Sequence, residues 1–515
     1  MTEAKRFPRA CVASPHYLAS SAGLAVLADG GNAIDAAIAT NLVLGVVAPY
    51  MCGYGGDLFA IVWDGKLHGY NGSGRSAAAA TPEKVTAAIG SDDMPFRGPH
   101  SVTVPGAVEG WFTLLERFGT RSFADLAATA LRYAKDGFPL STPIQHHLRH
   151  SSQLFADDWG AAWREVYAKG EPVLRQPDLA RTIETLCTDG PDAYYRGPIA
   201  EALAATVQRF GAFITTDDIA AHTGDDVEPL SASYRDTEVY QLPPNSQGLV
   251  ALEALNMVEG IDIGKANSSR RQHVLIEAMK LALVDRDTYI TDIDHMNIDP
   301  AELVSKQWGA SRAAGIDPKR AAMPPPGRPA LGGTIYLCTA DADGMAVSLI
   351  QSNFSGFGSG VVVDGWGINL QNRGAYFTLD PSHCNVIAPR KRTMHTLMPA
   401  MVFRDGKPWL VFGTMGGDGQ AQTHLQVLTR MIDDGLDIQD AIDAPRWFVS
   451  PPDWGLRAES RFHTDVLLEL EHLGHDVTKT PLYDTGMGHA HGIVVAPYGY
   501  AAATDPRAEG AALGL

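Results

Sequence analysis

The residue best placed for covalent chemistry is Thr334, which opens a strand-like run directly after Gly332 and Gly333. Residues 317–333, DPKRAAMPPPGRPALGG, cannot continue a helix or a central strand and are the best candidate linker in the chain. A lone threonine at a strand start is usually structural, because β-branched residues suit strands. Here the two glycines allow a distorted peptide at low steric cost, which favours a reactive hydroxyl.

A cut before Thr334 would give one residue both a hydroxyl nucleophile and a free α-amino group. That amine has a pKa of about 7.7–8.0, against about 10.4 for lysine, so an appreciable part of it is neutral near pH 7. A general base works best when its pKa lies near the working pH. Threonine with its own amine is a recognised activated nucleophile.

The pair Gly416–Gly417 is a second candidate, because it lies between the strand-like PWLVFGT and a predicted helix. A plain turn between strand and helix explains this pair about equally well. Glycine also lets backbone N–H groups face a ligand, and a helix N-terminus favours negative charge. Those are the properties that a tetrahedral oxyanion requires.

The elements around these positions alternate between hairpins and helices. Asn32 can cap a buried helix over residues 32–47, and LFAIVWDG with KLHGYNG reads as a hairpin turning at Asp64–Gly65. Hairpins are also predicted for TIYLCTA with MAVSLIQ and for PAMVFRDGKPWLVFG, whereas residues 81–315 read as mostly helical. Hairpins packed against helices make an α+β sandwich the natural architecture.

Composition excludes several classes of function. The 515 residues carry a net charge of −18, with 41 Lys and Arg against 59 Asp and Glu, which argues against nucleic acid as a partner. The N-terminus has no apolar core of signal-peptide length, and no apolar run could span a bilayer, so we expect a soluble cytoplasmic protein that does not bind membrane.

Metal and cofactor sites are not predicted. The five cysteines are scattered and form no CxxC pair, and no Ser elbow, Walker loop or dinucleotide fingerprint occurs. His146 and His150 are spaced to share one helix face but lack a third ligand, so we interpret them as surface residues. His489 and His491 alternate as in a strand, and we interpret them as structural.

The segment GGTIYLCTADADGMAVSLIQSNFSGFGSG resembles the maturation site of the gamma-glutamyltranspeptidase family. Five further motifs occur in the order that the family shows, namely GGNAIDAAIATNLVLGVVAP, PGAVEG, KRTMHTLMP, GTMGGDG and ATDPR. The resemblance therefore covers nearly the whole chain. It implies that the Thr334 hydroxyl attacks the Gly333 carbonyl, that an ester forms, and that water releases Thr334 as a new N-terminus. The implied fold is a four-layer αββα sandwich of the N-terminal-nucleophile hydrolase type.

The resemblance also implies roles for individual residues. Ser352 matches a hydroxyl that hydrogen-bonds the threonine's amine, although a plain strand-face serine is about equally expected. Gly416 and Gly417 lie where the family forms its oxyanion hole. Arg75, in NGSGRSAAA, matches the arginine that binds the substrate's α-carboxylate, a task that suits a planar guanidinium.

The chain departs from the family around the acyl pocket. Tyr376 replaces the carboxylate that holds the substrate's α-ammonium, and Arg373 replaces an amide. Phe354 replaces an asparagine, and His395–Thr396 replaces a pair of serines. A cation at Arg373 disfavours an ammonium and favours a second anion. These changes indicate the acylase and amidase branch of the family rather than strict glutamyl specificity.

We therefore expect a self-cleaving amidohydrolase or acyltransferase that acts on gamma-glutamyl or similar small acidic acyl-amides, with water or an amine as acceptor. Residues 1–333 would form a large subunit and residues 334–515 a small one, intertwined as one domain and still associated after the cut. An inactive, uncut homologue that serves as a binding protein is the alternative from another class. An unrelated α/β hydrolase is disfavoured because the Ser elbow is missing. The acyl group, the acceptor and a homo-oligomeric state are left open.

Overall fold

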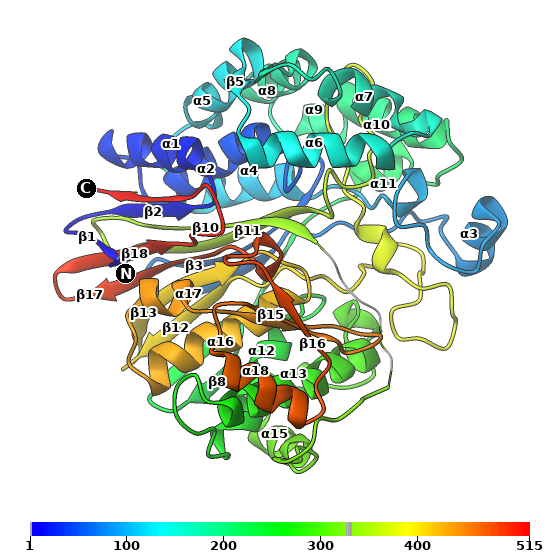
Figure 1. Ribbon diagram of the computed structural model, residues 1–515. Coiled ribbons are helices and arrows are strands. Elements are labelled where there is room, and N and C mark those ends of the chain that lie inside the picture. The colour runs from blue at the N-terminus through cyan, green and yellow to red at the C-terminus, as the bar shows by residue number, and fades with distance from the viewer. Residues whose placement is uncertain (1–2, 326, 328–331) are drawn as a thin grey trace.

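The computed structural model describes residues 3–325, 327 and 332–515. Two antiparallel seven-stranded sheets are stacked face to face, and helices cover both outer faces (Figure 1). The expected four-layer αββα sandwich is thereby confirmed. One sheet has the order β1 (Lys5–Phe7), β18 (Gly499–Thr504), β17 (Ala490–Ala496), β13 (Lys407–Thr414), β12 (Ala400–Arg404), β9 (Thr237–Gln241) and β8 (Leu230–Tyr234). The other has the order β19 (Ala511–Gly514), β2 (Cys11–Ser14), β10 (Gly333–Ala340), β11 (Ala346–Phe354), β3 (Asp57–Trp63), β4 (Leu67–Asn71) and β7 (Asp225–Val227).

Each sheet contains strands from both sides of Thr334, which itself lies in β10. Apolar side chains fill the space between the sheets, among them Phe59, Tyr336, Ile350 and Met401. Neither half of the chain could therefore bury its sheet surface without the other.

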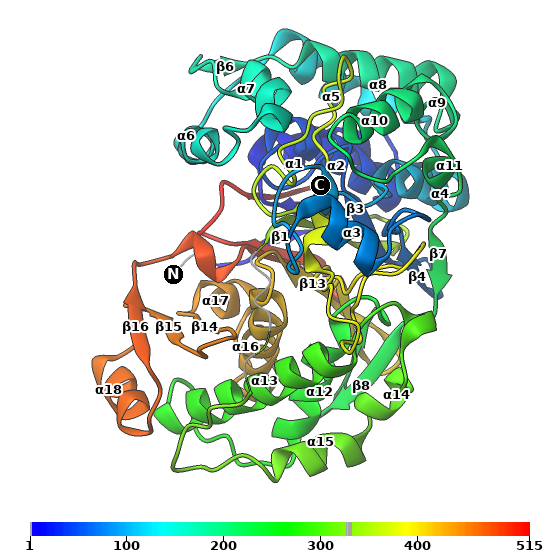
Figure 2. The same ribbon diagram turned by 90° about the vertical axis from the view of Figure 1, so that its right-hand side faces the viewer.

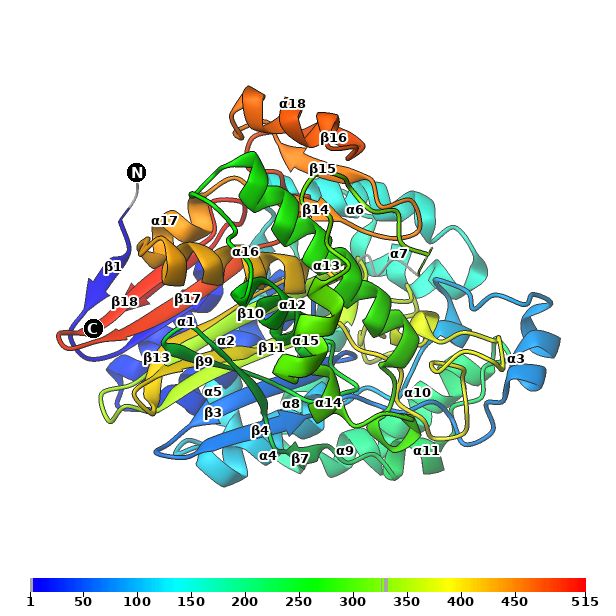
Figure 3. The same cartoon turned by 90° about the horizontal axis from the view of Figure 1, so that it is seen from below.

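The helices form two outer layers, one above and one below the sheets in Figure 2. The layer over β10, β11 and β3 contains α1 (Tyr17–Ala28), α2 (Ala33–Val47), α4 (Ala107–Phe118), α5 (Phe123–Asp136), α8 (Pro177–Asp189) and α10 (Pro198–Gln208). The layer over β12 and β13 contains α12 (Gly248–Glu259), α13 (Ser269–Tyr289), α16 (Gly419–Asp433) and α17 (Ile438–Asp443). Figure 3 shows α12, α13 and α16 from the side on which they cover the sheet.

Further elements surround this frame. They are the helices α3 (Pro82–Ile89), α6 (Thr142–Leu154), α7 (Ala161–Tyr167), α9 (Asp192–Tyr195), α11 (Thr216–Ala220), α14 (Pro300–Leu303), α15 (Lys306–Ala313) and α18 (Thr464–His472), and the strands β5 (Phe138–Pro139), β6 (Val173–Leu174), β14 (Trp447–Val449), β15 (Leu456–Glu459) and β16 (Val477–Thr480). No helix in the described ranges is long and apolar enough to cross a membrane.

The predicted helix over residues 32–47 is confirmed as α2. Asn32 and Asp35 form a reciprocal capping box at its start, and all fifteen helical residues are buried. The three predicted hairpins are confirmed as β3–β4, β10–β11 and β12–β13.

The prediction that residues 81–315 are mostly helical is incomplete, because β7, β8 and β9 lie within that range. These strands are only three to five residues long and bury residues irregularly or alternately, so they leave a weak pattern in the sequence. Part of the predicted linker, namely Pro326 and residues 328–331, lies outside the described residues. Within the described part, the carbonyls of Pro324 and Pro325 accept hydrogen bonds from the Trp454 side chain.

Candidate active site

Thr334 lies at an irregularity in the pairing of β10 with β11. Gly333 pairs with Phe354 and Ile335 pairs with Gln351, so one residue of β10 faces Ser352 and Asn353 together. Such bulges re-aim a side chain and are common beside active sites. Thr334 is fully buried at this position, near the end of the hairpin remote from its turn.

A chain of hydrogen bonds links the Thr334 hydroxyl to the preceding peptide bond. Thr334 Oγ1 donates to Ser352 Oγ at 3.0 Å, and Ser352 Oγ donates to the Gly333 carbonyl oxygen at 2.8 Å. The Phe354 N–H donates to Ser352 Oγ at 2.7 Å and fixes the serine hydroxyl. The structure thus brings together Gly333, Thr334 and Ser352. The serine hydroxyl is placed to accept a proton from the Thr334 hydroxyl and to polarise the Gly333 carbonyl.

Gly416 and Gly417 lie beside this peptide, after β13 and before α16. Gly416 has φ +132° and Gly417 has φ +58°, and a Cβ on Gly416 would lie 3.4 Å from Gly488 Cα. Both backbone conformations favour glycine. A Cβ on Gly332 would lie 3.6 Å from Gly417 N, so the backbone before the candidate cleavage bond packs against Gly417.

A buried ion pair holds the start of α16. Asp418 follows Gly417 directly, and Arg286 of α13 makes a short contact with its carboxylate. Both side chains are fully buried. Burial alone would lower the pKa of Arg286, but Asp287 and Asp418 raise it well above the ordinary value for arginine, so the guanidinium is a permanent cation behind the glycine pair.

Arg373 supplies a second buried cation, at the start of the short 3-10 turn Arg373–Tyr376. Its Nη1 donates to Thr396 Oγ1 at 3.3 Å, and the guanidinium carbon lies 4.1 Å from the centroid of the Phe354 ring. Its Nε and Nη2 have no hydrogen-bond partner among the described residues, although the side chain is fully buried. Burial lowers the pKa of Arg373 from 12.5 to about 9, which leaves it charged at neutral pH.

Phe354 and Tyr376 complete the surroundings of Arg373. Phe354 has φ +77°, a strained conformation for a bulky residue, and its ring packs edge-on against Tyr376 at a centroid distance of 6.3 Å. Thr396 is fully buried. The structure therefore brings Arg373, Tyr376 and Thr396 into one group next to the strand that carries Ser352.

His395 is directed away from this group, toward Asp57. Its Nε2 lies 3.1 Å from Asp57 Oδ2, and its Nδ1 accepts the Leu397 N–H at 3.3 Å. An accepting Nδ1 leaves the proton on Nε2, which therefore donates to the carboxylate. Burial, followed by Arg373 and Arg392, lowers the pKa of His395 well below 6.5, so the ring is neutral. Both ring nitrogens of His395 are therefore engaged within the protein, and its assignment to substrate binding stays a prediction.

Asp57 is a functional candidate that the sequence analysis missed. Its Oδ1 accepts from Gly74 N, Gly106 N and Gln371 Nε2 at 2.9–3.2 Å. Burial raises its pKa to about 6, although the bond from Gln371 and the charge of Arg373 act in the opposite direction. Asp57 follows the glycine-rich loop APYMCGYGG, but no spacing in the sequence indicates that four segments converge on it.

Arg75 occupies a different environment from Arg373. Its Nη1 lies 3.1 Å from Asp292 Oδ2 and its Nη2 lies 3.7 Å from Asp225 Oδ2, and its side chain is 34% exposed. It makes no hydrogen bond or ion pair with the other candidate residues in the described part of the chain. Two carboxylates already compensate its charge, so its assignment to a substrate carboxylate stays a prediction with less support than that of Arg373.

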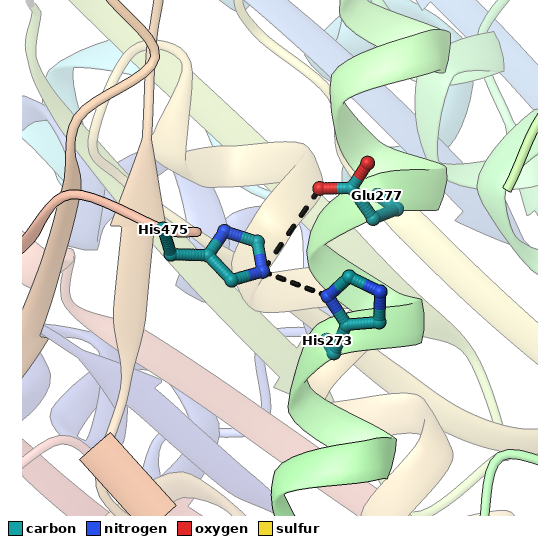
Figure 4. Close-up of side chains that lie close together, drawn as sticks. All are labelled: His273, Glu277 and His475. Carbon is teal, nitrogen blue, oxygen red and sulfur yellow. Dashed lines mark hydrogen bonds and ion pairs between the residues drawn. The ribbon is translucent and has the colours of Figure 1, made fainter. Parts of the chain in front are cut away.

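Two histidines and a glutamate form the one group of three potential metal ligands that lie close together within the described ranges. They are His273, Glu277 and His475 (Figure 4). His273 Nε2 donates to the Asp317 carbonyl at 2.8 Å, so its Nδ1 accepts from His475 Nε2 at 2.8 Å. Lys280 Nζ already pairs with Glu277 Oε1 at 2.9 Å. Lys280 therefore balances the charge of Glu277, and the absence of a metal stays a prediction.

Of the four other histidines with predicted roles, three lie where they were expected, and His489 lies just outside the predicted strand. His146 and His150 are exposed on α6, and His491 lies in β17 with its Nδ1 2.9 Å from Thr504 Oγ1. His489 is buried immediately before β17.

Comparisons with known proteins agree with this architecture. Residues 19–515 match the family model of gamma-glutamyltranspeptidase. A glutathione hydrolase-like proenzyme, YwrD, of Bacillus subtilis (strain 168) is 40% identical over 523 residues, with 98% of each chain covered. The oxamate amidohydrolase proenzyme of Klebsiella pneumoniae is 38% identical, with 97% of each chain covered. The crystal structure of cephalosporin acylase from Bacillus halodurans has a TM-score of 0.95 at 39% identity, covering 100% of this chain and 97% of that one.

The family match covers nearly the whole chain, and the sheet architecture agrees with that of the solved relatives. Relatives named as hydrolases, acylases and amidohydrolases share the family, and several are named as proenzymes. The chain belongs to the gamma-glutamyltranspeptidase family and is a hydrolase with the N-terminal-nucleophile fold.

Proposed function

We propose that this hydrolase cuts itself between Gly333 and Thr334 and then hydrolyses small acyl-amides whose acyl group carries a carboxylate and lacks an α-ammonium. The single observation that carries the specificity is Arg373, a fully buried cation with two N–H groups free of partners in the described part of the chain. A buried charge is costly unless it is paired, so a site of this kind is built for an anion.

Maturation follows from the hydrogen-bond chain at Thr334. The Oγ1 atom attacks the Gly333 carbonyl carbon and gives its proton to Ser352 Oγ, while the serine's own proton stabilises the carbonyl oxygen. Collapse breaks the C–N bond, the Thr334 nitrogen takes up the proton that Ser352 received, and an ester joins the Gly333 carbonyl carbon to Thr334 Oγ1. Water then hydrolyses the ester and leaves a Gly333 carboxylate and a free Thr334.

Turnover repeats this chemistry on an external amide. The free α-amino group of Thr334, with a pKa of about 7.7–8.0, accepts the hydroxyl proton as Oγ1 attacks the substrate carbonyl. The N–H groups of Gly416 and Gly417, at the N-terminus of α16, stabilise the oxyanion. The amine leaves with a proton, and water, or an amine acceptor in transfer, releases the acyl group from the threonyl ester.

The acyl pocket disfavours an ammonium group. Tyr376 offers a phenol where a carboxylate would be needed, and Asp57, whose charge acts on Arg373, has both oxygens engaged. Asp343 lies beyond the far end of β10, about 20 Å from Thr334 at roughly 3.3 Å per residue. The name of the oxamate amidohydrolase proenzyme, whose substrate is a small anionic amide, agrees with an anion at this position.

Denaturing electrophoresis and N-terminal sequencing test the nucleophile. We expect two fragments, the smaller beginning TIYLC, and a single uncut chain for Thr334→Ala. A wild-type chain that stays whole after long incubation at neutral pH would instead favour a binding protein without activity. Cutting of Thr334→Ala would exclude Thr334 as the nucleophile.

Two anilides that differ only in the α-amino group test the specificity. We expect kcat/KM for glutaryl p-nitroanilide to exceed that for gamma-glutamyl p-nitroanilide by at least about tenfold, which is about 1.4 kcal/mol. Glutathione and oxamate, followed by product analysis, extend the panel to natural amides. A tenfold preference for the gamma-glutamyl compound would show that an acidic partner exists and would overturn the proposed pocket.

A further inference from the structure

Gln247 links the two halves of the candidate site through one side-chain amide. It directly precedes α12 and is fully buried. Its Nε2 donates to the Gly417 carbonyl at 3.0 Å and to the Thr396 carbonyl at 3.1 Å. Its Oε1 accepts from Arg286 Nη1 at 3.2 Å. All three polar functions of the amide are therefore used.

The two carbonyls belong to segments with different tasks. Gly417 is one of the proposed oxyanion donors, and the Arg286 Nη1 that donates to Gln247 also contacts the Asp418 carboxylate. Thr396 carries the hydroxyl that contacts Arg373, the proposed anion-binding residue. These segments are far apart along the chain, at residues 396 and 417, and the Gln247 amide bonds directly to both.

We propose that Gln247 is a positioning residue that sets the geometry between the oxyanion donors and the acyl-anion pocket. This inference rests on the proposed function. An amide suits the task because its NH₂ group donates two bonds while its oxygen accepts one from a cation. A carboxylate would repel both carbonyls. An apolar side chain would remove one bond from each and leave the Gly417 carbonyl with the Gln420 N–H as its donor.

The expected consequence concerns catalysis more than binding. A displacement of about 1 Å between a carbonyl carbon and its oxyanion donors can lower the rate by about 100-fold. Arg373 would still attract the acyl carboxylate, because its charge does not depend on Gln247. We therefore expect Gln247→Leu to lower kcat about 100-fold and to change KM less than about threefold.

Gln426 of α16 offers a matched control. It is buried, its Nε2 donates to the carbonyls of Gln422 and Trp447 at 3.1 and 3.0 Å, and its Oε1 accepts the Trp447 N–H at 3.2 Å. Gln426→Leu therefore loses the same number of buried bonds away from the candidate residues. The Gln426→Leu variant should lose about as much thermal stability as Gln247→Leu and keep the wild-type kcat.

The assay uses the full chain of both variants, with kcat normalised to the fraction that carries a free Thr334. Inhibition by a boronic acid analogue of the glutaryl group, which forms a tetrahedral adduct with a hydroxyl, should weaken about as much as kcat falls in Gln247→Leu. Inhibition by glutarate should be unchanged. If Gln247→Leu cuts itself too slowly to give mature enzyme, its rate of self-cleavage is measured instead. We expect that rate to be about 100-fold below the rate for Gln426→Leu.

Gln247→Glu is the second variant and keeps the side-chain volume. It should lose as much kcat as Gln247→Leu, because the donors to both carbonyls are gone while the acceptor for Arg286 remains. Equal kcat in wild type and Gln247→Leu would overturn the inference, and so would parallel losses in boronate and glutarate affinity. Failure of both variants to fold, with Gln426→Leu folded, would make Gln247 a folding residue only. A Thr334→Ala chain that is still cut would overturn the proposed function itself.

Discussion

Replacement of Arg373 by methionine should make the protein slightly more stable and much less able to recognise an anionic acyl group. Methionine fills a similar length of buried space without a charge. The prediction separates a residue kept for function from one kept for stability, because the two effects have opposite signs.

The magnitudes follow from the burial of the guanidinium. A pKa lowered from 12.5 to about 9 corresponds to a cost of about 5 kcal/mol for the charged form, at about 1.36 kcal/mol per pKa unit. Loss of the contact with the Phe354 ring offsets about 2 kcal/mol, and loss of the bond to Thr396 offsets about 2 kcal/mol more. Arg373→Met should therefore gain about 1 kcal/mol, or about 1 °C in Tm for a chain of this length.

Substrate recognition should change by a larger amount. A hydrogen bond from a charged group contributes about 1.5–3 kcal/mol, so the loss of even one such bond should lower kcat/KM for glutaryl p-nitroanilide by about 10- to 150-fold. Pentanoyl p-nitroanilide has a methyl group in place of the carboxylate and should be hydrolysed equally by both proteins. Scanning calorimetry with and without glutarate, on chains inactivated by Thr334→Ala, adds a binding readout that does not depend on turnover.

Arg430→Met is the matched control for Arg373→Met. Burial also lowers the pKa of Arg430 to about 9, but its guanidinium donates to the Ala441 and Pro445 carbonyls at the far end of α16. It should leave the ratio of glutaryl to pentanoyl hydrolysis unchanged. If Arg373→Met also leaves that ratio unchanged, Arg373 does not face the acyl group and the proposed specificity is refuted.

Three further predictions concern other parts of the site and its frame. Ser352→Ala should slow self-cleavage by at least about 100-fold on a time-resolved gel, because one donor to the scissile carbonyl is lost; cleavage at the wild-type rate would exclude that role. Asp57→Asn should cost about 1–3 kcal/mol by calorimetry, because the three N–H donors at Oδ1 require the amide oxygen and the NH₂ group cannot accept the His395 Nε2–H, and an unchanged Tm would contradict the assigned tautomer. Arg507→Leu should cost about 3–5 kcal/mol at pH 7, because it leaves Asp505 short of a partner in a buried cluster. Burial alone would raise the pKa of Asp505, but neighbouring arginines hold it well below 3.8. The stability that this carboxylate contributes is therefore present above about pH 4 and lost as the pH falls. A penalty for Arg507→Leu that does not shrink under acid conditions would contradict this account.

Local patterns were enough to predict the parts of the fold that are continuous in sequence. The helix over residues 32–47 and the hairpins turning at Asp64–Gly65 and Asp405–Gly406 carry their capping and turn residues within a few positions. The strands of residues 225–241 were missed because their burial depends on neighbours from distant segments, and β9 pairs with β12 of the C-terminal half.

The residues of the candidate site also differ in whether the sequence could predict their roles. Thr334, Ser352 and the glycine pair lie in segments whose types and order indicate their chemistry. Asp57, Arg286 and Gln247 could not be predicted, because each acts through bonds to segments far away in the chain. The direction of His395 toward Asp57, rather than toward the acyl pocket, is likewise set by tertiary pairing.

Specificity in this pocket depends on which polar groups are already satisfied, not only on which charges are present. Asp57 has a carboxylate whose charge acts on Arg373, yet three N–H donors hold Oδ1 and His395 holds Oδ2. That carboxylate can lower the cost of the buried guanidinium, but a substrate ammonium would have to compete with four donors that it already accepts from the protein. Arg373 Nε and Nη2 have no hydrogen-bond partner within the described residues, so the proposed pocket leaves them for an anionic group of the ligand. A γ-glutamyl group would bring the carboxylate together with an ammonium that finds no partner, whereas a glutaryl or oxamate-like group brings the carboxylate alone.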